Sequence, residues 1–415
     1  MSRAAAPRCV DAAPTGSGGG SLPARDMLPR RVYRTLLRVQ IMTTRASHSF
    51  VFIVAVGCHE AGPKDTGDTS DTSDTTDTGV DTGLLPPCTS GSTFVTWTRD
   101  GGATLAPMTG APAPNTYTWS ITIPADDPLT LLVENNGTLW RSLDAGCTFT
   151  ALATLSDPWW SLTSAPDGRT WGYVANGSRV LYLEGDDVTE GDGPGGALFG
   201  MVLDPLDPTH VRVGAELTLY ERVGAGGWEV LGGPGTSESA YVWAFDPTDI
   251  DRAIVGMTRD GIWTTHDGGR RWAHAEGFDD RTNIYAAVWS PIDPEVVWAE
   301  GINMDESDAG APSGGRHVWR STDGGASFTP VVDQGGDVIL PNGVPMVADP
   351  VDADVVWFTF GSPFQGEGTR LYRYDAGTGL VTSERSTDWH GYQAMTFSPA
   401  DPALLYLAVL LEQID

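Results

Sequence analysis

The segment Ser321-Thr322-Asp323-Gly324-Gly325-Ala326-Ser327-Phe328 is one of three close copies of the pattern S/T-x-D-x-G-x-x-aromatic in this chain. The other two span residues 142–149 and 265–272. An aspartate and a nearby hydroxyl can satisfy backbone N–H groups within a tight hairpin, and glycine adopts the positive φ that such a turn needs. The pattern therefore predicts β-hairpins, and with them an all-β fold.

A second motif, a Pro/Asp turn that follows an apolar stretch and precedes a β-rich one, recurs seven times. Its anchor prolines, 39 to 59 residues apart, are Pro124, Pro166, Pro205, Pro247, Pro291, Pro350 and Pro399. Several repeats carry the aspartate pattern roughly twenty residues after the proline. Self-similarity at such a period is typical of repeat architectures. The two motifs in register predict seven structural repeats.

The aspartate pattern resembles the Asp-box, or bacterial neuraminidase repeat, of sialidases, xyloglucanases, sortilin-type receptors and photosystem assembly factors. The resemblance implies a β-propeller of four-stranded blades, with structural roles for the aspartates of these turns. Those aspartates are Asp144, Asp267 and Asp323, together with Asp100 in the segment 93–105. Seven repeats then predict a seven-bladed β-propeller with Asp-box hairpins.

The two ends of the chain are expected to share one blade. The last repeat stops after two predicted strands, while residues 93–105 supply strand, Asp-box and strand. N- and C-terminal strands would thus complete one blade together. Such closure leaves no open sheet edge.

The composition agrees with this fold and excludes some partners. Of 415 residues, 51 are Gly, 29 are Pro and 40% are apolar, which is typical of a turn-rich β protein. The net charge is −29, whereas nucleic-acid binders carry basic surfaces, so no nucleic-acid partner is expected. The chain lacks the motifs of serine, zinc and nucleotide enzymes, and neither a metal nor a cofactor is expected.

The N-terminal region differs from the rest in charge. Residues 1–57 hold eight arginines and two acidic residues, and their apolar segment 50–57 runs directly into Cys58. The segment resembles a bacterial lipoprotein signal with its lipobox, which implies lipidation of Cys58. The alternatives are an ordinary secretory signal and a chance apolar patch, each with an unmodified Cys58. Met42 would begin a signal of conventional length and leave residues 1–41 untranslated.

Three regions follow from this interpretation. Residues 1–57 are the leader, residues 58–87 are a lipidated cysteine and a disordered Asp/Thr-rich linker, and residues 88–415 are the propeller. We expect an exported monomer, held at the bacterial outer membrane by its lipid anchor alone. Cys88 and Cys147 are a disulfide candidate, because an even pair remains in an oxidising compartment. Two unpaired thiols are the alternative.

Ligand sites are expected on the face opposite the repeated turns, where the loops are irregular. Aromatic side chains there could stack on sugar rings, or they could instead fill the interior of the propeller. The ligand-binding candidates are Trp159, Trp160, Tyr241, Tyr285, Tyr392, Arg281, Arg385, Trp389 and His390.

Loop carboxylates on the same face support an enzymatic alternative, since two carboxylates across a cleft suit glycoside hydrolysis. The catalytic candidates are Asp280, Asp305, Glu306 and Asp388. Ordinary solvated loop acids are the other explanation of these residues. A sialidase is less favoured, because each candidate arginine has an acid beside it in sequence. The preferred prediction is a binding module for a glycan or protein ligand, and a receptor-like or assembly scaffold is a third hypothesis.

Overall fold

The computed structural model describes residues 88–110, 113, 115–340, 345–361, 369–386 and 391–411, which all belong to the unit Ser47–Asp415. The leader, Cys58 and the linker lie outside the described residues. So do Asp388, Trp389 and His390, and the side chain of Arg385 is not described. Within the described part of the chain, no helix has the length and apolar character that crossing a membrane requires.

The described chain is all-β, with five four-stranded antiparallel sheets that each use consecutive strands in sequence order. The first two sheets are β6 (Trp160–Ser164), β7 (Thr170–Val174), β8 (Arg179–Glu184), β9 (Asp187–Asp192), and β10 (Leu198–Leu203), β11 (His210–Ala215), β12 (Thr218–Val223), β13 (Glu229–Gly232). The third and fourth are β14 (Ala240–Phe245), β15 (Ala253–Met257), β16 (Ile262–Thr265), β17 (Ala273–His274), and β18 (Thr282–Trp289), β19 (Val297–Asn303), β20 (Arg316–Ser321), β21 (Thr329–Asp333). The fifth is β22 (Met346–Ala348), β23 (Val355–Gly361), β24 (Thr369–Asp375), β25 (Leu380–Ser386).

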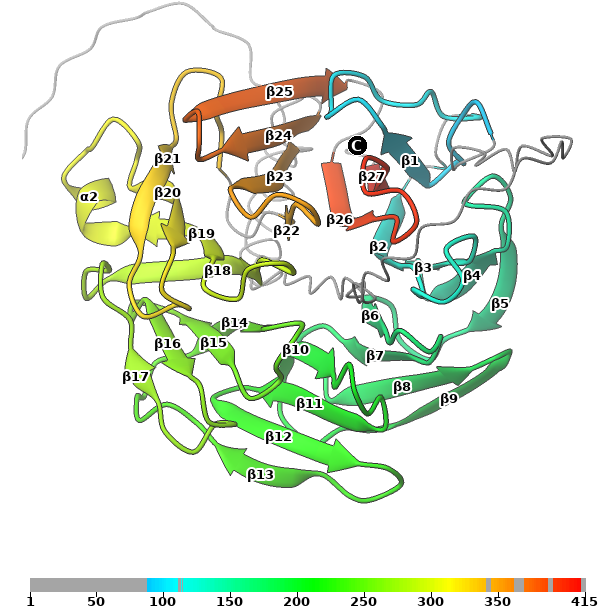
Figure 1. Cartoon of the computed structure of the whole chain (residues 1–415), viewed down its shortest axis with the longest axis horizontal. Coiled ribbons are helices and arrows are strands. Elements are labelled where there is room, and N and C mark those ends of the chain that lie inside the picture. Colours follow the sequence, from blue (N-terminus) through cyan, green and yellow to red (C-terminus); the bar gives the residue numbers. More distant parts are fainter. Residues whose placement is uncertain are drawn as a thin grey trace, which may run out of the picture. The chain divides into compact units, whose positions relative to one another are not determined.

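A seven-stranded sheet contains both ends of the described chain. Its strands are β1 (Val95–Thr98), β2 (Thr116–Thr122), β3 (Leu131–Asn135), β4 (Thr138–Ser142), β5 (Thr150–Thr154), β26 (Gly391–Phe397) and β27 (Leu405–Leu411). β27 pairs antiparallel with β26 and with β1, where Val95 lies opposite Ala408. Figure 1 shows the sheets following one another around a common centre, with the first strand of each nearest to it.

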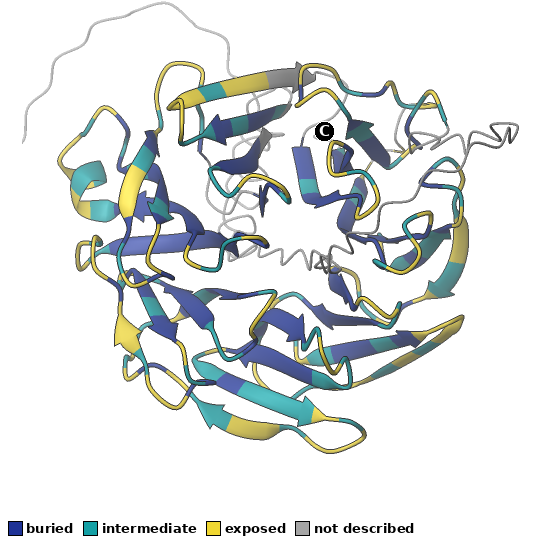
Figure 2. Cartoon of the chain, in the orientation of Figure 1, coloured by how far each residue is buried: buried dark blue, intermediate teal, exposed yellow. Residues whose placement is uncertain are grey.

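Burial falls from the first strands to the last strands of the sheets (Figure 2). Every residue of β18 and β19 is buried, whereas β9 and β13 are mostly exposed or half-buried. Strands covered on both faces are expected to be nearly continuous apolar runs, as in Val297-Trp298-Ala299. The apolar clusters lie between neighbouring sheets: one joins β18 and β19 to β22, β23 and β24.

In the four-stranded sheets each Pro/Asp turn connects the first and second strands, and the Asp-boxes of Asp267 and Asp323 connect the third and fourth. In the seven-stranded sheet the Asp144 box connects β4 and β5, and the Asp100 box follows β1. Because successive strands are antiparallel, both turns lie at the same end of the sheet. We call this end the Asp-box face. Within the Pro/Asp turns, a side-chain oxygen just before the proline accepts hydrogen bonds from the turn: Asp349 Oδ1 accepts from the backbone N–H groups of Val351 (3.0 Å) and Asp352 (3.1 Å).

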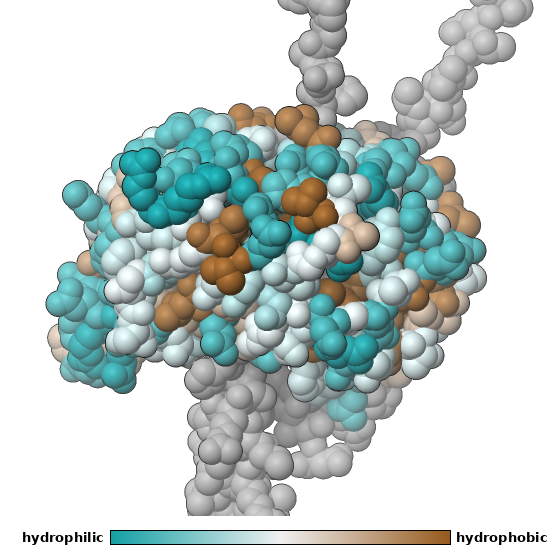
Figure 3. Space-filling model, turned by 90° about the horizontal axis from the view of Figure 1, so that it is seen from below, coloured by the Kyte–Doolittle hydropathy of each residue, from teal (hydrophilic) through white to brown (hydrophobic). Residues whose placement is uncertain are grey.

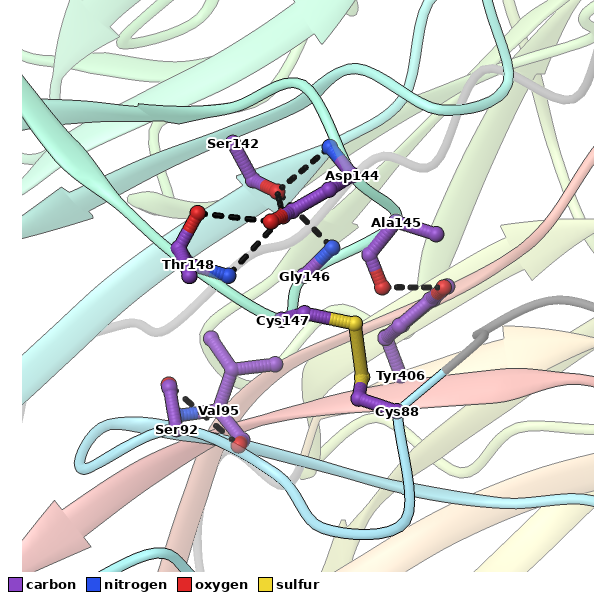
Figure 4. Close-up of a disulfide and its surroundings, with 10 residues drawn as sticks. All are labelled: Cys88, Ser92, Val95, Ser142, Asp144, Ala145, Gly146, Cys147, Thr148 and Tyr406. Atoms are coloured by element: carbon purple, nitrogen blue, oxygen red, sulfur yellow. Dashed lines mark hydrogen bonds between the residues drawn. A yellow bond between two sulfur atoms is a disulfide. The ribbon is translucent and has the colours of Figure 1, made fainter.

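Four Asp-boxes share one hydrogen-bond pattern. In the box of residues 142–149, the Ser142 hydroxyl donates to Asp144 (2.7 Å) and accepts from the Gly146 N–H (2.8 Å). Asp144 also accepts from the backbone N–H of Thr148 at 2.8 Å and from its hydroxyl at 2.6 Å. Figure 4 shows this network. The boxes of Asp100, Asp267 and Asp323 repeat the bonds from the hydroxyl two residues before and from the backbone four residues after.

The N-terminal segment differs from the expectation in one respect. β1 and the Asp-box of Asp100 form, but the residues after the box are not a regular strand. Ala106 nevertheless donates its N–H to Trp97 O (2.8 Å) and accepts from the Thr96 hydroxyl (2.7 Å). The next residue, Pro107, accepts a hydrogen bond from the Gly91 N–H (2.9 Å), so the chain after Ala106 pairs with the segment that precedes β1.

Cys88 and Cys147 form a disulfide, with their Cα atoms 5.6 Å apart. Cys147 lies in the Asp-box turn between β4 and β5, and Cys88 precedes β1 (Figure 4). The bond therefore fastens the start of the described chain to the Asp-box face. This pairing is the first of the two alternatives that the cysteine count left open.

Candidate functional site

The connection between β19 and β20, opposite the Asp-box face, carries several of the candidate residues. It contains a short helix, α2 (Met304–Asp308), with Asn303 at its N-cap. The Asn303 side chain accepts from the backbone N–H groups of Asp305 and Glu306, and donates to Asp279 (2.7 Å) and Glu306 (3.1 Å). Sequence reasoning missed this helix. An asparagine followed by acidic residues is the N-terminal signal that could have revealed it.

Arg281 is held by the helix. Its guanidinium donates to Asp305 (2.7 Å) and to Asp308 (2.8 Å). Hydrogen bonds to Asp308 and Asp305 raise the pKa of Arg281 above its usual value. Two of the predicted site residues are thus brought together as a surface ion pair. Exposed pairs of this kind contribute little to stability because water screens them, so the pairing orders the loop more than it stabilises the fold.

His317, on β20, lies between two carboxylates. Its Nε2 is 3.0 Å from Glu306 and its Nδ1 is 2.7 Å from Asp333. The side chain is only 7% exposed. A general base must reach the proton that it removes, and both nitrogens of this buried ring are already engaged. The cluster therefore braces the loop, and it joins Glu306 to a histidine that the sequence reasoning did not single out.

The carboxylate candidates have different surroundings within the described residues. Asp280 is exposed, Asp305 is paired with Arg281, and Asp388 lies outside the described residues. In the described part of the chain, no group of three or more histidine, cysteine, aspartate or glutamate side chains is arranged to hold a metal ion.

The aromatic ligand-binding candidates that the structure describes differ in burial. Trp160, Tyr285 and Tyr392 are 0%, 5% and 3% exposed, so they pack inside the fold. Tyr241 is half-buried, with its ring 5.0 Å from that of Tyr285. Trp159 is 47% exposed, which leaves it as the accessible tryptophan of this set.

Trp159 has a backbone φ of 68°, in the left-handed region that is uncommon for residues other than glycine. Its ring lies 5.8 Å from that of Trp119. The strained backbone directs one tryptophan outwards while the next residue, Trp160, remains buried. The doublet in the sequence gave no indication of which ring would be accessible.

Glu134 is a further residue that the sequence reasoning missed. It lies near the end of β3, is 0% exposed, and accepts a hydrogen bond from the Gly137 N–H at 2.6 Å. Burial raises the pKa of Glu134 to about 8, although hydrogen bonds from the backbone of Gly137, Trp159 and Trp160 act in the opposite direction. Glu134 therefore links the β3–β4 turn to the segment that begins β6, and no signal in the sequence marks it.

The repeated antiparallel sheets around a centre define a protein of the β-propeller type. Solved structures agree with this fold. A GH74 enzyme of Niastella koreensis matches with a TM-score of 0.54 at 16% identity, over 72% of this chain and 52% of that chain. A virginiamycin B lyase of Staphylococcus aureus matches with a TM-score of 0.50 at 12% identity, over 72% and 95%. This chain thus spans about half of the GH74 enzyme.

The chain belongs to the family of the dispase autolysis-inducing protein of Streptomyces mobaraensis. The two are 41% identical over 342 residues, which cover 80% of this chain and 90% of that protein. A xyloglucanase of Paenibacillus sp is 23% identical over 187 residues, which cover 40% of this chain and 18% of that enzyme. A search of protein-family models gives no match.

Proposed function

We propose that this protein is a binding module whose ligand is a protease of the dispase kind, and that binding promotes self-cleavage of that protease. One observation carries the proposal: 41% identity over 90% of a protein named for inducing dispase autolysis. The candidate site supports binding rather than hydrolysis, because Arg281 pairs with Asp305 and the enclosed His317 pairs with Glu306.

The proposed scaffold is a closed ring of seven blades. β2–β5 would be one blade of the seven-stranded sheet, and β26, β27 and β1 would be another. The antiparallel pairing of β1 with β27 supports the view that the two ends of the chain close the ring. A closed ring protects its sheet edges and gives a rigid platform for a partner.

The proposed location follows from the N-terminal residues. Lipidation at Cys58 would tether the propeller to the bacterial outer membrane, and the acidic stretch 58–87 would act as an extended spacer. We propose that the protein works there as a monomer. Mass spectrometry of the native protein tests the anchor: the mature N-terminus should be Cys58 carrying a lipid, and an unmodified thiol would contradict it.

The function is tested by mixing the purified protein with dispase. Intact dispase should disappear faster than in its absence, and self-cleavage fragments should appear. Heat-denatured protein provides the control for nonspecific effects. Equal rates of dispase loss with native protein, denatured protein and buffer would contradict the proposal.

A glycan ligand is the second candidate, because Trp159 exposes 47% of its surface beside Trp119. Aromatic faces of this kind can pack on sugars. A glycan array probed with the parent and with Trp159→Ser would reveal such a ligand, and fluorogenic glycosides would reveal hydrolysis. Hydrolysis lost in Asp305→Asn would establish the enzymatic alternative instead.

A further inference from the structure

Exposed apolar side chains are concentrated on one face of the described protein. Nine large apolar residues are exposed among the described residues, and seven of them lie at or beside turns of the Asp-box face. These seven are Leu129, Leu143, Leu206, Val223, Ile292, Val351 and Leu380. Single exposed apolar residues are ordinary, whereas a grouping on one face indicates an interaction surface.

Three of the seven occupy the same position, immediately after the anchor proline of a Pro/Asp turn. Leu206 is 93% exposed, Ile292 is 50% exposed and Val351 is 65% exposed. In each turn the backbone N–H of this residue is bonded to the side chain before the proline, at 2.9, 3.4 and 3.0 Å respectively. The turn thus fixes the backbone while the side chain projects into solvent.

The fold does not require an aliphatic residue at this position. The turn between β14 and β15 has Thr248 there, and the turn between β26 and β27 has Ala400. Thr248 makes the equivalent backbone bond, with its N–H 2.8 Å from Asp246. Leu206, Ile292 and Val351 therefore contribute little to folding, and their shared placement is available for binding.

A carboxylate follows each aliphatic residue, as Asp207, Asp293 and Asp352. These carboxylates accept backbone N–H bonds two residues further on, at 3.1, 3.0 and 3.0 Å. The hydrogen bond from the Thr209 side chain lowers the pKa of Asp207, which keeps it charged. Each of the three turns thus presents an aliphatic side chain followed by a carboxylate.

Arginine side chains form ion pairs that connect neighbouring turns. Arg212 pairs with Asp251 (2.6 Å) in the next turn, and Arg252 pairs with Glu295 (3.0 Å) in the one after. Arg320 pairs with Asp354 in the turn of Val351. These bonds hold consecutive turns in fixed relation.

We propose that Leu206, Ile292 and Val351, with Asp207, Asp293 and Asp352, form the docking surface for the protease, which presents an apolar patch bordered by lysine or arginine. The inference rests on the proposed function and assigns it to the Asp-box face. Charge complementarity selects this occupant. A second copy of the chain would bring like charges together, and an anionic membrane surface would be repelled by the same carboxylates.

The test compares two sets of serine substitutions in the full chain. The first is Leu206→Ser, Ile292→Ser and Val351→Ser together. The second, the control, is Val230→Ser alone, which removes an aliphatic side chain of similar exposure, 66%, from the outer strand β13. Figure 3 shows the molecule from below Figure 1, where apolar residues form small patches separated by hydrophilic ones.

Dispase binding by surface plasmon resonance should weaken at least tenfold in the triple variant, with slower dispase autolysis, and stay unchanged in the control. Asp207→Asn, Asp293→Asn and Asp352→Asn keep the oxygen that accepts the turn N–H. These changes should reduce the dependence of binding on salt. Circular dichroism verifies folding.

Three results would overturn the inference. If the triple variant binds dispase as tightly as the parent, the docking surface lies elsewhere while the proposed function stands. If the parent does not bind dispase, the result contradicts both the docking surface and the proposed function. If light scattering shows a parent dimer that the triple variant converts to monomer, the face belongs to a second copy of the chain.

Discussion

The Tyr406 hydroxyl donates a hydrogen bond to the carbonyl oxygen of Ala145, 2.9 Å away and 261 residues earlier in the chain. Tyr406 is on β27 and is 1% exposed, and Ala145 is in the Asp-box turn that also holds Cys147 (Figure 4). Burial raises the pKa of Tyr406 well above its usual value, so the hydroxyl stays a neutral donor. One side chain thus joins the last strand to the first complete hairpin.

We expect Tyr406→Phe to lower the free energy of unfolding by about 1 kcal/mol, because the buried Ala145 carbonyl loses its donor. Urea unfolding measures the change. Tyr182→Phe is the matched control: its hydroxyl bonds to Glu184 at the surface (3.1 Å), so its cost should stay within about 0.5 kcal/mol. Equal effects of the two substitutions would argue against a special role for the Tyr406 bond.

The disulfide should stabilise the same junction. Cys88 and Cys147 enclose a loop with a sequence separation of 59 residues, and a loop of that length predicts a stabilisation of about 4 kcal/mol from the reduced entropy of the unfolded chain. Reductant should therefore lower the midpoint of thermal unfolding. Cys88→Ala with Cys147→Ala should unfold at the lower midpoint and respond no further to reductant. A parent midpoint that ignores complete reduction, verified by thiol titration, would contradict the prediction.

Much of the fold could be predicted because its determinants are local. An Asp-box is specified within eight residues, and the Pro/Asp turn within about six, so each repeat is readable without knowledge of its neighbours. The residues after Asp100 show the limit of this reasoning. Ala106 bonds to β1, whereas Pro107 bonds to Gly91 before β1, and no local pattern in the sequence marks this change of partner.

The Asp-boxes should be structural, and Asp323 offers a clean test. It accepts from the Ser321 hydroxyl (2.7 Å) and from the N–H (2.9 Å) and hydroxyl (2.5 Å) of Ser327. Asp323→Ala should lower the free energy of unfolding by about 1–2 kcal/mol and leave dispase binding unchanged. Asp337→Ala is the control, because that carboxylate is 88% exposed. If Asp323→Ala has the same free energy of unfolding as the parent, a structural role for Asp323 is contradicted.

The candidate site could be predicted only in part, because its contacts depend on how loops fold over one another. Asp305 and Arg281 were both singled out, yet their pairing with each other depends on α2, which the sequence reasoning did not predict. Trp159 and Trp160 are adjacent in sequence and opposite in exposure, since the positive φ of Trp159 reverses its direction. Glu134 is a strand residue among apolar neighbours, and only its burial makes it unusual.

The buried Glu134 carboxyl should make the folded protein less stable as the pH rises from about 4.5 to 8. Burial raises its pKa in the folded protein to about 8, from the ordinary value of 4.5 that applies to the unfolded chain. Below pH 4.5 both states hold the proton, and the group makes no difference between them. As the pH rises from 4.5 to 8, the unfolded chain releases its proton while the folded protein retains it, so the free energy of unfolding falls. Above pH 8 both states are ionised and the buried charge carries its full cost.

Glu134→Gln removes this titration while keeping an oxygen for the Gly137 N–H. Each unit of pKa difference corresponds to about 1.4 kcal/mol. The free energy of unfolding of the variant minus that of the parent should therefore be larger at pH 9 than at pH 4.5, by up to a few kcal/mol. Urea unfolding of both proteins at pH 4.5, 6, 7.5 and 9 measures the two curves. Parallel curves would show that Glu134 is ionised in the folded protein, and the buried carboxylate would then need a compensating partner.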